Sequence, residues 1–312
     1  MRIVVTGVTG QVGWELVRSL QPLGEVVALD SRTLDLGAAD APARLQVKLK
    51  EIAPQVIVNP AAYTAVDKAE SEAAKARAIN AVAPAAMADY CARTSGLLVH
   101  YSTDYVFDGT RDGRYREDDP TAPANTYGLT KLEGEQAIQA SGCAHLILRT
   151  SWVYSLHGGN FLRTMVRLAA TREHLKIVSD QCGVPTPASF IADTTAQLIG
   201  RRLGGAALAD WSGILNLTPA GRTSWFDYAG AALAILNRAT QAAAAPGSQL
   251  PMPRPEWQVA RLPTLEAIPA ASYPTPARRP ANSCLDLTRI EDVWGLKMPA
   301  WDALLATVLR DA

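Results

Sequence analysis

The chain has 312 residues, of which 48% are hydrophobic and 19% charged, the balance of an ordinary globular protein. Thirty basic and thirty acidic side chains give a formal net charge of zero, so no overall field attracts nucleic acid or an anionic membrane. The cysteines, Cys91, Cys143, Cys182 and Cys284, form no CxxC pair, which argues against a zinc knuckle and against a disulfide framework.

The N-terminal residues and the apolar runs bear on location. Arg2-Ile3-Val4-Val5 has the character of a strand and lacks the charged-then-apolar design of a secretion signal. No apolar run approaches the ~20 residues needed to cross a bilayer. We therefore expect a cytoplasmic protein without a membrane or nucleic-acid partner.

The first half alternates short apolar runs with longer amphipathic stretches. The short runs predict strands buried on both faces, at Ile3–Thr6, Val26–Asp30, Val56–Asn59, Leu97–Ser102 and Leu146–Thr150. The longer stretches predict helices at Gln11–Leu20, Pro42–Ile52, Ala81–Arg93 and Tyr127–Ala140. This alternation predicts an α/β fold with a doubly wound parallel sheet, Rossmann-like, over residues 1–150. Such sheets bind ligands at the carboxyl ends of their strands.

The second half is less regular. It predicts helices at Phe161–Ala170, Ile191–Arg202, Trp225–Leu236 and Ala300–Leu309, and strands at Ile214–Leu217 and Val259–Leu262. Ala242–Pro255 is expected to be a surface connection and Pro269–Pro280 an extended loop. Because no clean linker separates the halves, residues 151–312 are expected to form mostly a smaller, interwoven substrate-binding domain. Segments at roughly 160–200 would return to the first domain.

A glycine-rich loop, Gly7-Val8-Thr9-Gly10-Gln11-Val12-Gly13, follows the first predicted strand and opens a helix. Gly7 permits the tight turn, Gly10 lets the backbone approach a diphosphate, and Gly13 allows the helix to pack closely on the strand. The free N–H groups at the helix N-terminus then face the diphosphate. Asp30, at the end of the second strand, is placed to accept a hydrogen bond from an adenosine ribose hydroxyl. The loop therefore predicts a nicotinamide dinucleotide site.

The residues after Asp30 bear on the choice of cofactor. Asp30 alone would repel the 2′-phosphate of NADPH, whereas Ser31 and Arg32 follow directly and could accommodate it. We expect the protein to use both cofactors, with NADPH preferred and NADH as the alternative.

Tyr127 and Lys131 lie four residues apart at the start of a predicted helix and so share one face. A lysine ammonium beside a phenol stabilises the phenolate and lowers the phenol pKa from about 10. The tyrosine can then donate its proton to a carbonyl oxygen as hydride arrives at carbon, while the lysine also holds the nicotinamide ribose. Thr103, at the end of the fourth strand, could hydrogen-bond the developing alkoxide. A surface helix and a strand-end turn are the alternative interpretations.

Three motifs together resemble the extended short-chain dehydrogenase/reductase superfamily: Gly7-x-x-Gly10-x-x-Gly13, Ser102-Thr103-Asp104 and Tyr127-x-x-x-Lys131. Further motifs narrow the resemblance to the RmlD family of dTDP-4-dehydrorhamnose reductases. They are Gly10-Gln11-Val12-Gly13, Val66-Asp67-Lys68-Ala69-Glu70, Ser102-Thr103-Asp104-Tyr105-Val106-Phe107, Arg149-Thr150-Ser151-Trp152-Val153-Tyr154, Asp180-Gln181-x-Gly183-x-Pro185-Thr186 and Arg279-Pro280-x-Asn282-Ser283. The resemblance covers nearly the whole chain.

This resemblance implies that dTDP-4-dehydro-L-rhamnose is reduced at C4 to dTDP-L-rhamnose, the rhamnose donor for cell-surface polysaccharide, including lipopolysaccharide. It implies that Tyr127 is the proton donor, Lys131 its electrostatic partner, and Thr103 the hydroxyl that tunes it. The implied cofactor contacts are Gln11, Val12, Asp30, Asp35, Leu36, Ala61, Ala62 and Tyr63. The implied substrate contacts are Thr103, Asp104 and Trp152.

Some proteins of this family hold Mg²⁺ through glutamates at a dimer contact. Glu15 and Glu291 fall where two of these acids would be, but the third position matches Ser189 or Phe190. Because Mg²⁺ prefers several carboxylate or water oxygens, two solvated surface glutamates are the alternative interpretation. Magnesium and a homodimer are therefore expectations that depend on where these glutamates lie.

Other functions are also consistent with a nicotinamide site. A sugar-nucleotide dehydratase would need an acid after Thr103-Asp104, where this chain has Tyr105, and an epimerase would retain its NAD. A cofactor-binding regulatory subunit, like those of methionine adenosyltransferase, would not need Thr103, Tyr127 and Lys131 together.

The histidines, His100, His145, His157 and His174, have no metal-ligand spacing. His100 and His145 border predicted strands. We expect both to be structural.

Overall fold

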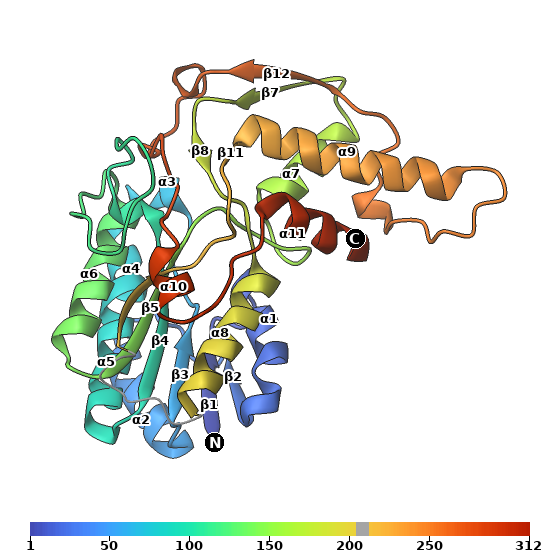
Figure 1. Ribbon diagram of the computed structural model, residues 1–312. Coiled ribbons are helices and arrows are strands. Elements are labelled where there is room, and N and C mark those ends of the chain that lie inside the picture. Colours follow the sequence, from blue (N-terminus) through green and yellow to red (C-terminus); the bar gives the residue numbers. More distant parts are fainter. Residues whose placement is uncertain (204–211) are drawn as a thin grey trace.

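The centre of the computed structural model, which describes residues 1–203 and 212–312, is a parallel sheet (Figure 1). Its strands are β1 (Arg2–Thr6), β2 (Glu25–Leu29), β3 (Val56–Asn59), β4 (Leu97–Thr103), β5 (Ala144–Thr150) and β10 (Gly213–Asn216). They lie in the order β10-β5-β4-β3-β1-β2, and every neighbouring pair is parallel. The predicted doubly wound sheet is confirmed.

Helices cover both faces of this sheet. One face packs against α1 (Gln11–Ser19), α8 (Ala188–Leu203) and α10 (Thr288–Asp292), and the other against α2 (Ala41–Ile52), α5 (Ala83–Thr94) and α6 (Thr126–Ala140). Ile3 and Val5 belong to the first core and Val4 to the second, because successive side chains of a strand point to opposite faces. Short helices α3 (Val66–Ala69) and α4 (Ala73–Arg77) and a π-helical turn η2 (Ala78–Val82) lead into α5.

A second unit with its own core lies above the carboxyl edge of the sheet in Figure 1. It contains α7 (Phe161–Ala169), α9 (Trp225–Ala244) and α11 (Trp301–Val308), with β7 (His174–Val178) paired to β12 (Thr264–Ile268). The short pairs are β6 (Val153–Tyr154) with β9 (Thr186–Pro187) and β8 (Cys182–Gly183) with β11 (Thr223–Ser224). Single turns of helix are η1 (Gln21–Leu23), η3 (Asp104–Val106), η5 (Pro255–Trp257), η6 (Ala270–Ser272) and η7 (Leu309–Asp311).

Two elements expected in the second half differ from the structure, and strand β7, which pairs with β12, was not expected. Val259–Leu262 is not a strand, because side chains of α9 bond its backbone: Thr240 accepts from the Val259 N–H, and Asn237 donates to the Val259 carbonyl. The strand β12 begins at Thr264, two residues after Leu262. Helix α9 also extends to Ala244, into the predicted surface connection.

The chain crosses between the two units more often than expected. Within 160–200, α8 returns to the sheet, whereas α7 packs in the second core. Later, β10 joins the sheet beside β5, and α10 packs on its face. The division near residue 150 stays a prediction, and residues 204–211 of the expected second domain lie outside the described part.

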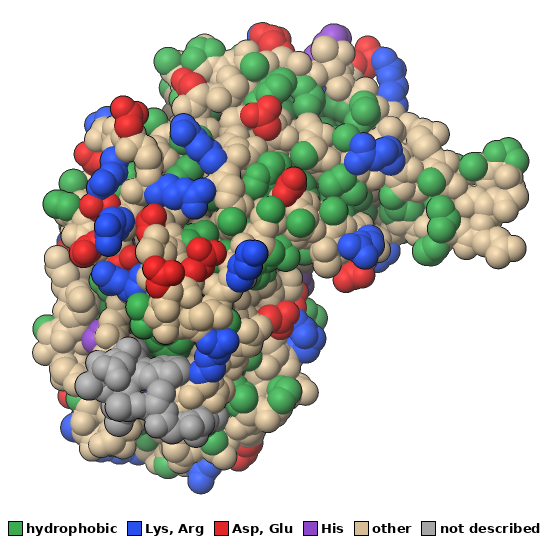
Figure 2. Space-filling model, viewed as in Figure 1, with side chains coloured by type: hydrophobic (Ala, Val, Ile, Leu, Met, Phe, Trp, Pro, Cys, Tyr) green, Lys and Arg blue, Asp and Glu red, His purple; other side chains and the backbone are tan. Residues whose placement is uncertain are grey.

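The distribution of charge on the visible surface agrees with the zero net charge of the sequence. Figure 2 shows basic and acidic side chains intermixed on one face of the molecule. Within 1–203 and 212–312, no helix combines the length and apolar character that a membrane span requires.

Candidate active site

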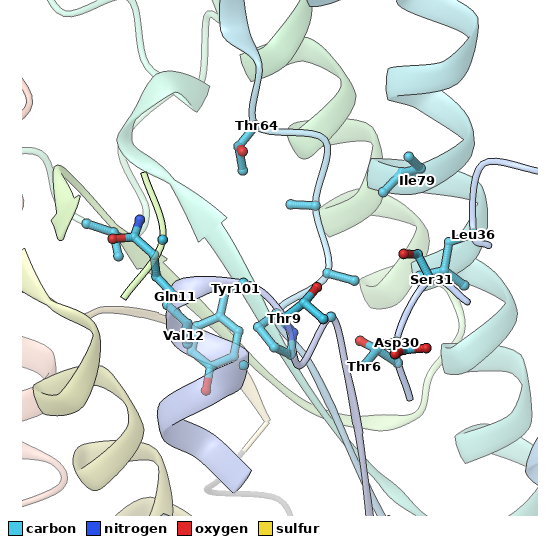
Figure 3. Close-up of a pocket in the computed structure, with 18 of the residues that line it drawn as sticks. Thr6, Thr9, Gln11, Val12, Asp30, Ser31, Leu36, Thr64, Ile79 and Tyr101 are labelled. Atoms are coloured by element: carbon cyan, nitrogen blue, oxygen red, sulfur yellow. The ribbon is translucent and has the colours of Figure 1, made fainter. Parts of the chain in front are cut away.

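A cavity of about 480 Å³ opens at the carboxyl edge of the sheet (Figure 3). Asp30, Ser31 and Leu36 lie together at one end of it and Gln11 at the other. Its lining includes these expected cofactor residues: Gly7, Gly10, Gln11, Val12, Gly13, Asp30, Asp35, Leu36, Ala61, Ala62, Tyr127 and Lys131. One cavity thus brings together the glycine loop and the Tyr–Lys pair.

The glycine loop fits a bound diphosphate. Gly7 has a φ of +57°, and a Cβ there would lie 2.8 Å from the Ala61 Cα. A Cβ on Gly13 would collide with the Gly7 carbonyl. The N-cap residue of α1 is Gly10, which has no side chain to accept from the first turn, so the N–H groups there can bind an anion. The close packing therefore requires glycine and leaves backbone donors at the cavity.

The adenosine end of the cavity carries an ion pair. The Asp30 carboxylate accepts hydrogen bonds from the Arg32 guanidinium, at 2.6 and 2.9 Å, and from the Thr33 N–H at 2.9 Å. The Arg32 hydrogen bond is the main reason that the pKa of Asp30 falls to about 2. A cofactor 2′-phosphate would therefore meet an ionised carboxylate whose charge is balanced by the exposed Arg32 guanidinium.

The start of α6 holds Tyr127 at the cavity. The Asn125 side chain caps the helix by accepting from the Gly128 N–H at 2.8 Å, and Glu70 accepts from the Thr126 N–H at 2.8 Å. The Thr103 hydroxyl shares a hydrogen bond with the Tyr127 phenol. Burial raises the pKa of Tyr127 to about 12, although the Thr103 bond opposes the rise. The expected lowering is not found, because burial, with a smaller contribution from the Asp104 charge, outweighs the Thr103 hydrogen bond.

Lys131 lies one helical turn after Tyr127 and is 1% exposed. Its Nζ donates to the Tyr101 carbonyl at 2.5 Å and lies 3.0 Å from His100 Nε2. Burial lowers the pKa of Lys131 to about 7, while the Glu135 carboxylate acts in the opposite direction. The amine is thus held by the sheet at the wall of the cavity.

Behind Lys131 lies a buried polar chain that the sequence interpretation missed. His100 Nδ1 lies 3.0 Å from Asn59 Nδ2, and the Thr6 hydroxyl donates to Asn59 Oδ1 at 2.6 Å. His100 and Asn59 are paired positions of β4 and β3, and Thr6 follows the Val5–Val58 pair at the end of β1. The available signal was a polar residue towards the carboxyl end of three mostly apolar strands.

The remaining expected residues do not line this cavity. Asp104 is 3% exposed, and burial raises its pKa to about 7. Within the described residues its Oδ2 is buried without a hydrogen-bond partner. Trp152 has a φ of +47° and stacks on Trp225 at 3.5 Å. Tyr63 donates its N–H to Asn80 and its hydroxyl to Glu72.

The residues present do not fit the expected magnesium ion. Glu15 forms an ion pair with Arg18 at 3.5 Å, and Glu291 accepts from the Met298 N–H at 3.1 Å. In the described part of the chain, no group of three or more His, Cys, Asp or Glu side chains comes together as ligands. The expectation of Mg²⁺ is not supported, because each glutamate is engaged locally.

Comparison with known proteins agrees with this geometry. The family model described as "RmlD substrate binding domain" matches residues 1–312. The dTDP-4-dehydrorhamnose reductase of Burkholderia thailandensis is 46% identical over 100% of this chain and 99% of its own length, and that of Escherichia coli K12 is 42% identical over 100% and 98%. A crystal structure of the Bacillus anthracis dTDP-4-dehydrorhamnose reductase, in complex with NADP, superposes with a TM-score of 0.84 at 29% identity, covering 100% of this chain and 99% of that one. The chain belongs to the RmlD family.

Proposed function

We propose that this protein reduces the C4 keto group of dTDP-4-dehydro-L-rhamnose to give dTDP-L-rhamnose, with NADPH as the preferred cofactor and NADH as the alternative. Two relatives at 42–46% identity over the full chain carry the name of this activity. The observation that carries the proposal is the single cavity lined by both the glycine loop and the pair Tyr127 and Lys131.

In this proposal the chain supplies a proton and the cofactor supplies the electrons. A reduced nicotinamide held by these residues would supply hydride to the C4 carbon. Tyr127 donates its phenolic proton to the carbonyl oxygen, which becomes the C4 hydroxyl. A pKa of about 12 keeps this phenol protonated at neutral pH until the reaction. Lys131 stabilises the resulting phenolate, and Thr103 holds the phenol oriented through their shared hydrogen bond.

The other assignments follow the shape of the cavity. Gly7, Gly10 and Gly13 would hold the cofactor diphosphate, with Asp30, Asp35 and Leu36 around the adenosine ribose and Ala61 and Ala62 further along the cofactor. Tyr63 does not line the cavity, and its assignment to the cofactor rests on the family resemblance alone. Ser102 Oγ and Thr150 Oγ1 are buried without partners in the described chain and line the cavity, where a polar ligand would satisfy them.

The sugar would lie beside Tyr127, on the side of the second unit. Asp104 is assigned to the substrate because its buried carboxyl, which hydrogen-bonds Thr103 and Ser283, has an Oδ2 without a partner among the described residues, and a sugar hydroxyl could donate there. Trp152 is assigned to the sugar face, with Trp225 stacked behind it as a support. Trp225 was not among the residues expected from the sequence.

The test follows the reduced-nicotinamide absorbance with purified protein, NADPH or NADH, and dTDP-4-dehydrorhamnose generated in place. We expect the absorbance to fall as dTDP-rhamnose forms. Tyr127→Phe should retain cofactor affinity and lose turnover by at least ~100-fold, because its proton transfer acts in the transition state. Lys131→Met should weaken both, and unchanged cofactor affinity would remove its ribose role. Near-normal turnover of Tyr127→Phe would refute the mechanism.

The same assay separates the alternatives. Purification with tightly bound NAD and no net consumption of NADPH would favour an epimerase. Cofactor binding with no turnover of any sugar nucleotide would favour a regulatory subunit. The proposal places the reaction in the cytoplasm. A homodimer, tested by sedimentation velocity, stays a prediction.

A further inference from the structure

A buried histidine supports the amine of Lys131 from the side opposite the cavity. His100 is 0% exposed and lies between Lys131 Nζ and the Asn59 amide, 3.0 Å from each. The chain continues to Thr6, so hydrogen bonds run from α6 across three neighbouring strands. Asn59 is also 0% exposed, so solvent offers no substitute for any missing partner.

The chemistry of these groups limits how their protons can be arranged. Burial, and then the charge of Lys131, hold the pKa of His100 well below its ordinary value, so the ring is neutral and carries one N–H. An ammonium has only donors, so a charged Lys131 requires a bare Nε2 and a proton on Nδ1. The backbone of Asn59 hydrogen-bonds the ring and favours a ring N–H. For the Asn59 side chain this tautomer requires the reversed amide orientation, in which Oδ1 faces Nδ1 and Nδ2 donates to the Thr6 hydroxyl; the orientation with Nδ2 facing Nδ1 and Oδ1 accepting from Thr6 belongs to the Nε2–H tautomer. The opposite tautomer, with Nε2–H facing the amine, suits only an uncharged lysine.

We propose that His100 is a positioning residue of the reductase: as the Nδ1–H tautomer it accepts a hydrogen bond from Lys131 and keeps that amine charged and directed at Tyr127. The inference rests on the roles of Tyr127 and Lys131 in the proposed function. Without this acceptor, burial would favour the neutral amine even more strongly. His100 acts through Lys131 and has no assigned contact with substrate.

Other charged groups around the amine come from α6, β5 and the turn after β4. Glu135 lies one turn further along α6 and raises the pKa of Lys131, but its carboxylate is bound by Arg149 of β5. Asp104 acts on Tyr127. The partners from β3 and β1, Asn59 and Thr6, are neutral. His100 is therefore the acceptor that can be changed without adding or removing a formal charge.

Two substitutions separate the ring nitrogens. His100→Gln places an amide oxygen near the position of Nε2, whereas His100→Asn reaches only the position of Nδ1. We expect the alkaline decline of kcat, which follows loss of the Lys131 proton, to move about one to two pH units lower in His100→Asn and to stay near the wild-type position in His100→Gln. A purely structural histidine would leave this decline in place in both variants, and that result would overturn the proposal.

A second measurement does not depend on turnover or on the variants folding. The ¹⁵N chemical shifts of the imidazole, recorded for the wild-type protein at pH 6 with NADP⁺ bound, distinguish the two tautomers of His100. A protonated Nδ1 with a bare Nε2 is the expected result, and the Nε2–H tautomer would overturn the proposal. This readout is independent of the Tyr127→Phe test, so failure of the inference and failure of the proposed function can be told apart.

Discussion

Glu135 and Arg149 form a buried ion pair one helical turn beyond Lys131, and Glu135→Gln should destabilise the protein strongly. The side chains are 1% and 2% exposed, and the pair is bidentate, with Nε–Oε1 at 2.9 Å and Nη2–Oε2 at 2.6 Å. Glutamine keeps the shape and one acceptor but removes the charge. The guanidinium then remains buried without a counter-ion.

The expected loss in the free energy of unfolding is about 3 kcal/mol. Removing one partner of a buried ion pair costs ~3–5 kcal/mol. The amide oxygen of glutamine can still accept one hydrogen bond from Arg149, so the loss should fall at the lower end of this range. Arg149→Met should cost a similar amount, since it also leaves the Glu117 carbonyl without its 3.1 Å donor. The double variant should lose less than the sum, because no unpaired charge remains.

The assay is urea unfolding of the wild type, both single variants and the double variant, at neutral pH. The midpoints should fall in the single variants with the slope m unchanged, which would place the effect in native-state stability. Two results would contradict the dependence of one charge on the other. The free energy of unfolding of Glu135→Gln could lie within ~1 kcal/mol of the wild-type value, or the losses of the two single variants could be strictly additive in the double variant.

Three further predictions concern the cavity. Arg32→Ala should shift the ratio of kcat/KM for NADPH over NADH about tenfold towards NADH, because the 2′-phosphate loses a cation and meets the bare carboxylate of Asp30; an unchanged ratio would exclude Arg32 from this selection. Burial lowers the pKa of Lys131 from 10.5 to about 7, so between these pH values the unfolded chain binds a proton that the folded chain does not. Stability should therefore rise with pH through this window, and the slope should be smaller in Lys131→Met, as measured by urea midpoints across pH; equal slopes would contradict the buried lysine. Gly13→Ala should weaken NADPH binding at least ~10-fold in a fluorescence titration, because its Cβ meets the Gly7 carbonyl and displaces the loop, and wild-type affinity would show that the loop tolerates the added carbon.

The parts of the site that were predicted from the sequence are local. The interval between Gly7 and Gly13 and the four-residue spacing of Tyr127 and Lys131 are set by one turn and one helix. These features brought the residues to one cavity once the strands paired in parallel. The prediction of a strand at Val259–Leu262 was wrong, because two side chains of α9, about 20 residues earlier in the chain, hydrogen-bond the backbone of Val259.

The strand–helix alternation, the glycine loop and the shared face of Tyr127 and Lys131 could be predicted from the sequence, because each is encoded by periodicity or spacing within a short stretch. Three contacts emerge only from the folded chain: His100 beside Lys131, the ion pair of Glu135 with Arg149, and the stacking of Trp152 on Trp225. These contacts join residues from different elements, so they depend on strand register and helix placement. A buried polar side chain must find its partner wherever the fold places one, and the local sequence does not specify that position.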